Sequence, residues 1–112
     1  MDLGIAGRTA LVAASSAGLG YETAKALATA GCKVVISGRN EERLNQAAEN
    51  IPESIPIIAD VSSVEGSTQL VKKANEMLGS SIDILVTNAG GPPPGTFEST
   101  DLDQYLSALE LN

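Results

Sequence analysis

A glycine-rich turn near the N-terminus carries the first residues whose types and spacing point to chemistry. The segment Ala13-Ala-Ser-Ser-Ala-Gly-Leu-Gly20 follows an apolar run and leads directly into a stretch with helical spacing. Because Gly18 and Gly20 lack a Cβ, the backbone N–H groups at the helix N-terminus can approach a pyrophosphate, which the helix dipole also favours. Ser15 and Ser16 would add hydroxyl donors. We assign Ala14 and Leu19 to the same predicted phosphate site.

This turn has a simpler explanation as well. It departs from the usual G-x-G-x-x-G pattern, because Thr23 stands where the third glycine is expected. Two glycines could merely let a helix pack closely on a strand. The position of the turn, in the first strand-to-helix connection of the chain, favours dinucleotide binding.

The end of the second apolar run, Ser37-Gly-Arg-Asn40, indicates which nucleotide the site should prefer. An acidic residue at this place would hydrogen-bond the ribose hydroxyls of NAD. Here Gly38 leaves space and the planar Arg39 guanidinium offers paired donors to a 2′-phosphate. The alternative is a solvated arginine, although a cation at a helix N-terminus opposes the helix dipole. We therefore predict that NADP(H) is preferred over NAD(H).

With these residues the chain resembles the short-chain dehydrogenase/reductase family, whose first turn usually reads T-G-x-x-x-G-x-G. Gly18 and Gly20 match the last two glycines, whereas Ala13 and Ala14 replace the Thr and the first Gly. Alanine adopts a positive φ less readily than glycine, so this replacement bears on how the turn closes. Three further motifs follow in the order the family has them: Asp60-Val61, Asn88-Ala-Gly90 and Asn112.

The resemblance implies that Asp60 and Val61 contact the adenine ring. The Asp60 carboxylate would accept from the exocyclic amine, while Val61 would frame the ring. An Asx turn that precedes Ser62 is the alternative, and the two roles are compatible.

The resemblance also implies roles for the later motifs. Asn88, Ala89 and Gly90 would stabilise the sheet and let the nicotinamide and its ribose pass closely, and Asn112 would hold water in the catalytic proton relay. The alternatives are a plain strand-terminating turn for the first motif and a surface asparagine at a helix end for the second.

The chemistry implied by the family is hydride transfer between nicotinamide and a small-molecule carbonyl or alcohol, with Ser, Tyr and Lys assisting. A Tyr-x-x-x-Lys pair does not occur in these 112 residues. We therefore expect residues 1–112 to be one dinucleotide-binding domain, the N-terminal half of a larger single-domain enzyme, and to be inactive alone. The 3-oxoacyl reductase branch is a possible affiliation. A noncatalytic dinucleotide-binding or redox-sensing protein is the alternative function, and a flavodoxin-like domain fits the glycine spacing less well.

Short apolar runs that alternate with helical stretches must position these motifs. Four parallel strands are predicted: Thr9–Ala13, Lys33–Ser37, Ile55–Ala59 and Ile82–Thr87. Pro56 would remove a ladder hydrogen bond, which places the third strand at the sheet edge. The predicted class is α/β, a Rossmann-type doubly wound sheet in three αβα layers, and family analogy gives the strand order 3-2-1-4.

The helical stretches carry their own start and stop signals. The first buries Gly20, Ala24, Leu27 and Ala28 and ends at Gly31. In the second, Asn40 caps a stripe of Leu44, Ala47, Ala48 and Ile51 before Pro52. The third begins at a Ser62-x-x-Glu65 capping box, buries Leu70, Val71, Ala74, Met77 and Leu78, and ends at Gly79. A fourth starts at Thr100, after the loop 90–95.

Composition limits the classes of partner. The chain has 14 acidic and 7 basic residues and a formal net charge of −7 at pH 7, so we expect no nucleic-acid and no membrane partner. His is absent and Cys32 is the single cysteine, so we expect no metal site and a cytoplasmic location. A homo-oligomer, either dimer or tetramer, is expected from the resemblance alone.

Overall fold

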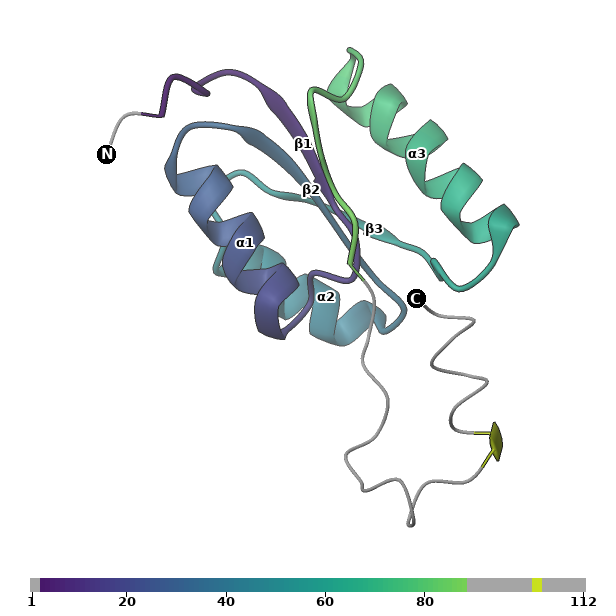
Figure 1. The fold of residues 1–112 in the computed structure, drawn as a ribbon. Coiled ribbons are helices and arrows are strands. Elements are labelled where there is room, and N and C mark those ends of the chain that lie inside the picture. Colours follow the sequence, from purple (N-terminus) through teal and green to yellow (C-terminus); the bar gives the residue numbers. More distant parts are fainter. Residues whose placement is uncertain (1–2, 89–101, 104–112) are drawn as a thin grey trace.

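The computed structural model describes residues 3–88 and 102–103, and these form a parallel sheet with helices on both faces (Figure 1). In chain order the elements are β1 (Thr9–Val12), α1 (Gly18–Thr29), β2 (Lys33–Gly38), α2 (Glu41–Glu49), β3 (Ile55–Ile58), α3 (Val64–Leu78) and β4 (Ile84–Val86). The strands lie in the order β3-β2-β1-β4, all paired parallel. The predicted α/β class and strand order are confirmed.

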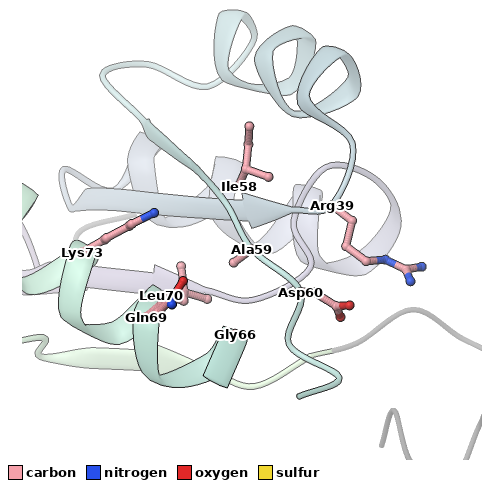
Figure 2. A pocket seen from close by; sticks show the side chains of 8 residues that line it. All are labelled: Arg39, Ile58, Ala59, Asp60, Gly66, Gln69, Leu70 and Lys73. Carbon is pink, nitrogen blue, oxygen red and sulfur yellow. The ribbon is translucent and has the colours of Figure 1, made fainter. Parts of the chain in front are cut away.

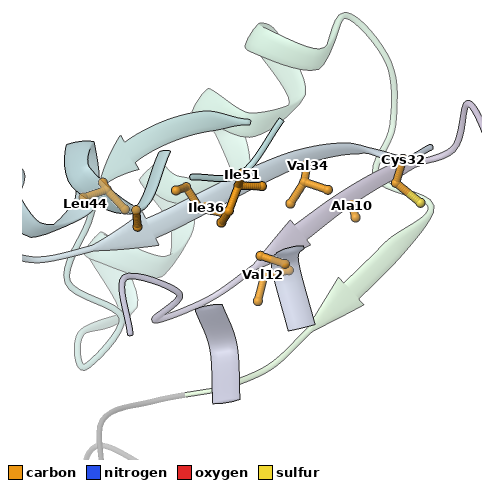
Figure 3. Packing of buried hydrophobic residues seen from close by; sticks show 9 residues of the cluster. Ala10, Val12, Cys32, Val34, Ile36, Leu44 and Ile51 are labelled. Carbon is orange, nitrogen blue, oxygen red and sulfur yellow. The ribbon is translucent and has the colours of Figure 1, made fainter. Parts of the chain in front are cut away.

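The two faces of the sheet carry separate apolar clusters, which define the three layers. Alternate residues of β1 and β2 point toward α1 and α2, as Figure 3 shows for Ala10, Val12, Val34 and Ile36. The residues between them, such as Leu11 and Val35, pack against α3 on the opposite face. Because both faces are covered, the central strands are apolar at nearly every position. Pro56 lies in β3, at the edge of the sheet, as expected.

The second helix follows the prediction at its start and differs at its end. The Asn40 side chain accepts a hydrogen bond from the backbone N–H of Arg43, which confirms the cap. The helix ends at Glu49, so Ile51 packs into the core from the following turn and not from the helical stripe.

The third helix corrects two predictions. Its cap is Ser63, which accepts from the N–H of Gly66, because the Ser62 hydroxyl is used by Asp60 two residues earlier. Its buried side chains are Leu70, Ala74 and Leu78, a single i, i+4 row, while Val71 is 41% exposed and Met77 61% exposed. This row packs over β2 and β3, and Val71 and Met77 lie to either side of it. It ends at Gly79 with φ 70°, as predicted.

The remaining predicted elements differ in their bounds or lie outside the described residues. β1 and β4 are shorter than the apolar runs that predicted them, although the Ala13 N–H still bonds the Val86 carbonyl at 3.1 Å. The loop 90–95 and the helix expected after Thr100 fall largely outside the described part. Within the described residues, no helix has the length and apolar character needed to traverse a bilayer.

Candidate functional site

The carboxyl ends of β1, β2 and β3 meet around a pocket of about 250 Å³, which we call the turn pocket. Its lining residues come from the glycine-rich turn, the end of β2, the start of α2 and the segment after β3. They are Ala14, Ser16, Ala17, Gly38, Arg39, Arg43, Ala59, Asp60 and Val61. Segments far apart in the sequence are therefore assembled where ligands bind in open parallel α/β sheets.

The two glycines of the turn have different structural roles. Gly18 has φ +64° with open space where a Cβ would project, so it supplies the left-handed conformation and leaves its backbone accessible. Gly20 is buried, and a Cβ there would overlap the Ala14 carbonyl oxygen and lie 2.8 Å from the Asn88 Nδ2. Gly20 therefore lets α1 pack closely against the turn, while Gly18 leaves the backbone of the turn accessible.

Ala14 stands at positive φ, a conformation that glycine adopts more readily than alanine. Its φ is +49°, a region that costs an L-residue about 1–2 kcal/mol. Its N–H donates to the Ser37 Oγ at 3.1 Å, and its carbonyl accepts from the Asn88 Nδ2 at 3.1 Å. The turn therefore closes despite the alanine, because β2 and the end of β4 hold Ala14 from both sides.

The two serines of the turn separate in the structure. Ser16 lines the turn pocket and is partly exposed. Ser15 is fully buried: its hydroxyl donates to the Val12 carbonyl at 2.8 Å and accepts from the Ser37 N–H at 2.9 Å. Its own N–H bonds the Ser37 carbonyl at 2.7 Å. The expectation that the Ser15 hydroxyl serves a phosphate is corrected, because its donor and acceptor capacity is used in joining β1 to β2.

The N-terminus of α1 opens beside the turn pocket without a cap of its own. Ala17 is the N-cap residue and makes no side-chain cap hydrogen bond. Gly18 and Leu19, in the first turn of the helix, are exposed, and Leu19 is 84% exposed. The first N–H groups of a helix have no intrahelical acceptor and carry partial positive charge. This end of α1 can receive an anion.

Arg39 also lines the turn pocket and directly follows β2. Within the described part of the chain it forms no side-chain hydrogen bond and no ion pair. The preceding Gly38 packs closely on the turn, because a Cβ there would come within 3.3 Å of the Ser16 side chain. Arg39 also borders a second pocket of about 400 Å³ between β3 and α3 (Figure 2).

Of the two roles that the sequence left open for Asp60, the structure contains the Asx turn. One carboxylate oxygen accepts from the N–H and the hydroxyl of Ser62, at 3.0 and 2.6 Å, so the Asx turn is present. These hydrogen bonds, and then the charge of Arg39, hold the pKa of the Asp60 carboxyl below its usual value, so it is ionised at neutral pH. In Figure 2 Asp60 and Arg39 extend to the same side of the sheet. The second carboxylate oxygen can still accept from a ligand.

The segment after Asp60 is held in place by close packing. A Cβ on Gly66 would overlap the Asp60 carbonyl oxygen, so only glycine lets the first turn of α3 approach this strand end. Val61 lines the turn pocket and also packs against the α3-side core. Close packing therefore holds Asp60 and Val61, the two predicted adenine contacts, in place.

The structure adds two residues that the sequence analysis missed. Ser37 bonds the backbone of both Ala14 and Ser15, and its signal was a hydroxyl residue at the end of an otherwise apolar strand. Arg43 lines the turn pocket, and its signal was a basic residue in the first turn of a helix that opens with two glutamates. Of the other predicted site residues, Asn88 lies behind the turn, and Ala89, Gly90 and Asn112 lie outside the described residues.

Comparisons with known proteins identify the family. A family profile described as short chain dehydrogenase matches residues 8–112. The chain therefore belongs to the short-chain dehydrogenase family of oxidoreductases, and the strand order described above is the one expected of it. It is 34% identical to an uncharacterised oxidoreductase of Staphylococcus saprophyticus, over 94% of this chain. It is also 34% identical to the 7alpha-hydroxysteroid dehydrogenase of Escherichia coli K12, over 99% of this chain.

A solved structure supports the same relationship. The L-sorbose reductase of Gluconobacter frateurii, in complex with NADPH and L-sorbose, superposes with a TM-score of 0.84 at 31% sequence identity. The match covers 99% of this chain and 44% of that one. The chain likewise spans 47% and 44% of the length of the two relatives above. The shared region thus amounts to less than half of each of these proteins.

Proposed function

We propose that this chain is the NADP(H)-binding part of an oxidoreductase that transfers hydride between nicotinamide and a small-molecule carbonyl or alcohol. The observation that carries the proposal is the turn pocket, which is lined both by Ala17, the N-cap residue of the uncapped helix α1, and by Arg39. A pyrophosphate suits the first and a phosphate on the adenosine ribose suits the second. The NADPH bound by the related L-sorbose reductase supports this choice of cofactor.

The described residues fit such a cofactor in their chemistry. Gly18 leaves the approach to the α1 amides open, and a Cβ there would meet nothing within 4 Å. Asp60 and Val61, in the same pocket, suit an adenine ring. Bound NADPH would supply the hydride, while these residues bind and orient its adenosine half. Asn88, Ala89 and Gly90 would border the nicotinamide half, and Asn112 would serve the proton relay.

The rest of the proposal extends to the whole protein. The acid–base Tyr, its Lys and the Ser that polarises the carbonyl would come from outside these residues, so the segment 1–112 would bind nucleotide and not turn over substrate. We place residues 1–112 as the N-terminal half of a single-domain enzyme that works in the cytoplasm as a dimer or tetramer.

Cofactor preference tests the proposal directly. Titration of the full-length protein with NADPH and NADH, followed by nicotinamide fluorescence, should show tighter binding of NADPH. Arg39→Glu should reverse the NADPH/NADH ratio of kcat/KM, because it removes a phosphate partner and adds an acceptor for the ribose hydroxyls. The expected change in the ratio is about a hundredfold, since charged hydrogen bonds contribute about 1.5–3 kcal/mol each.

A matched control separates the site from general charge. Lys72→Glu makes the same charge change at an exposed position of α3, outside the turn pocket, and should leave the ratio unchanged. Equal affinity of the wild-type protein for both nucleotides would overturn the NADP preference. Nucleotide binding with no turnover of any carbonyl or alcohol would favour a sensor over an enzyme.

A further inference from the structure

Ser37 is a buried hydroxyl residue at the end of the apolar run in β2. It is 1% exposed and does not line the turn pocket. A hydroxyl that is buried without hydrogen-bond partners costs free energy, so its partners indicate what it does. The Ser37 Oγ accepts from the Ala14 N–H at 3.1 Å and donates to the Val12 carbonyl at 3.4 Å. The side chain therefore serves the backbone of β1 and of the glycine-rich turn.

The backbone of Ser37 makes a separate set of contacts. Its N–H donates to the Ser15 Oγ at 2.9 Å, and its carbonyl accepts from the Ser15 N–H at 2.7 Å. The Val12 carbonyl also accepts from the Ser15 Oγ, at 2.8 Å, so it keeps this partner without the Ser37 hydroxyl. Within the residues that the structure describes, the Ala14 N–H has no other acceptor. Removal of the Ser37 hydroxyl alone therefore acts mainly on Ala14.

Ala14 is the residue that needs to be held. Its φ of +49° is one that glycine adopts readily and alanine does not. Its carbonyl accepts from the Asn88 Nδ2 and lies against Gly20, where a Cβ would overlap it. The Ser37 hydroxyl thus holds the N–H side of Ala14, and Asn88 holds the carbonyl side. The conformation between them determines how α1 begins beside the turn pocket.

We propose that Ser37 is a positioning residue for the cofactor, because its hydroxyl holds Ala14 at positive φ and thereby keeps the first amides of α1 in place for the pyrophosphate. This inference rests on the proposed NADP(H) function and adds a residue that acts through Ala14 and not by touching the nucleotide. A glycine at position 14 would adopt the same conformation unaided. The need for the Ser37 hydroxyl therefore arises from the alanine.

The first test removes the hydroxyl in the full-length protein. Ser37→Ala should weaken NADPH about tenfold, measured by nicotinamide fluorescence, because Ala14 loses one of the two hydrogen bonds that hold it. NADH should weaken by the same factor, since the pyrophosphate is common to both nucleotides. An unchanged NADPH/NADH ratio distinguishes this role from that of Arg39, whose replacement should alter the ratio.

The second test repeats the change where the hydroxyl is not needed. In the Ala14→Gly protein, Ser37→Ala should weaken NADPH no more than about twofold, because glycine keeps the positive φ without being held. A purely structural contribution of Ser37 would instead cost the same affinity whether residue 14 is alanine or glycine. The difference between the two backgrounds thus measures the positioning effect.

A matched control removes a buried hydroxyl from the opposite end of β1. Thr9 is 5% exposed, and its Oγ1 donates to the Ser81 carbonyl at 2.7 Å and accepts from the Asp83 N–H at 3.0 Å. Thr9→Val breaks these hydrogen bonds and should lower the stability measured by urea unfolding. Because Thr9 lies outside the turn pocket, the affinity for NADPH should not change.

The outcomes separate the inference from the function on which it rests. If NADPH binds and Ser37→Ala keeps the wild-type affinity, the role of Ser37 is wrong and the proposed function stands. A loss that Ala14→Gly does not reduce, or that Thr9→Val shares, would indicate general destabilisation and also overturn the inference. A wild-type protein that binds neither nucleotide would overturn both. Equal affinity for NADPH and NADH, with the dependence on residue 14 intact, would overturn the NADP preference and support the role of Ser37.

Discussion

The three helices of the described region begin in two different ways. At α2 and α3 the side chains of Asn40 and Ser63 accept hydrogen bonds from the backbone N–H groups of Arg43 and Gly66. At α1 the N-cap residue is Ala17, which makes no such bond. A capping side chain stabilises a helix by about 1 kcal/mol. In α2 and α3 a side chain therefore takes up one of the first helical amides, whereas in α1 no capping side chain does.

The uncapped end is nevertheless held in place by its own contacts. The turn before α1 contains Ala14 and Gly18, both at positive φ, and the backbone of Ala14 is held by Ser37 and Asn88. Gly20 brings α1 against this turn. A preorganised ligand site needs a backbone that is held in place while its hydrogen-bond donors stay free. The start of α1 has both properties, which suits it to bind a ligand.

The largest effect is expected where a side chain would break this rigidity. In Gly20→Ala the new methyl group overlaps the Ala14 carbonyl oxygen, and backbone cannot move aside as a flexible side chain can. Overpacking of about 3 kcal/mol, less about 1 kcal/mol from better helix propensity, predicts a loss of about 2 kcal/mol in the free energy of unfolding. Urea unfolding would measure this loss, and NADPH titration should show that binding is lost with it.

Gly79→Ala is the matched control for this variant. Gly79 ends α3 with φ +70° and has open space around it, so alanine there suffers only conformational strain of about 1 kcal/mol. NADPH affinity should not change. If Gly20→Ala proves no more damaging than Gly79→Ala, then close packing at the α1 start is not what supports the turn.

The second prediction gives α1 the cap that it lacks. Ala17 already has extended N-cap angles, so the carboxylate of Ala17→Asp can accept from the free amides and should stabilise the ligand-free protein by about 1 kcal/mol. It occupies the same amides as a pyrophosphate and repels it, so NADPH affinity should fall at least tenfold. Unfolding in the absence of ligand and nucleotide titration measure the two effects.

Two further variants test whether a cap raises stability at the expense of NADPH affinity only at α1. Ala17→Asn supplies a cap without charge and should weaken NADPH by a smaller factor than the aspartate. Ser63→Ala removes the cap of α3 and should lower the free energy of unfolding by about 1 kcal/mol with NADPH affinity unchanged. An Ala17→Asp protein with undiminished NADPH affinity would show that the α1 amides do not hold the phosphate.

Sequence patterns predicted the features that are local in origin. The apolar runs gave the strands, Asn40 its cap and Gly79 its helix end, because each depends on neighbouring residues only. The cap of α3 was placed one residue early, since Ser62 and Ser63 are chemically equivalent until Asp60 engages one of them.

Features that depend on packing between distant segments were not predictable in this way. Ser15 has the right type and position for a phosphate contact, and only its distance to Ser37, on the neighbouring strand, shows that it faces inward. The sequence alone assigns no function to Arg43, and only the fold places it in one pocket with Arg39 and Asp60. The partner of Ser15 is Ser37, on β2, and Arg43 shares its pocket with Asp60, which follows β3. Both come close only through the order of the strands in the sheet.

The smallest predicted effect concerns the strain held at Ala14. In Ala14→Gly the removal of the Cβ relieves about 1–2 kcal/mol at φ +49°, and the freer unfolded chain offsets about 0.5–1 kcal/mol of this gain. The variant should therefore unfold with about 0.5 kcal/mol more free energy, and NADPH affinity should stay within twofold because Ser37 and Asn88 still hold the backbone. Ala13→Gly is the control, since Ala13 is not at positive φ and its replacement should only destabilise. If both glycine variants lose stability equally, the clamp on Ala14 imposes no strain, and the turn differs from the capped helix starts only in its unsatisfied amides.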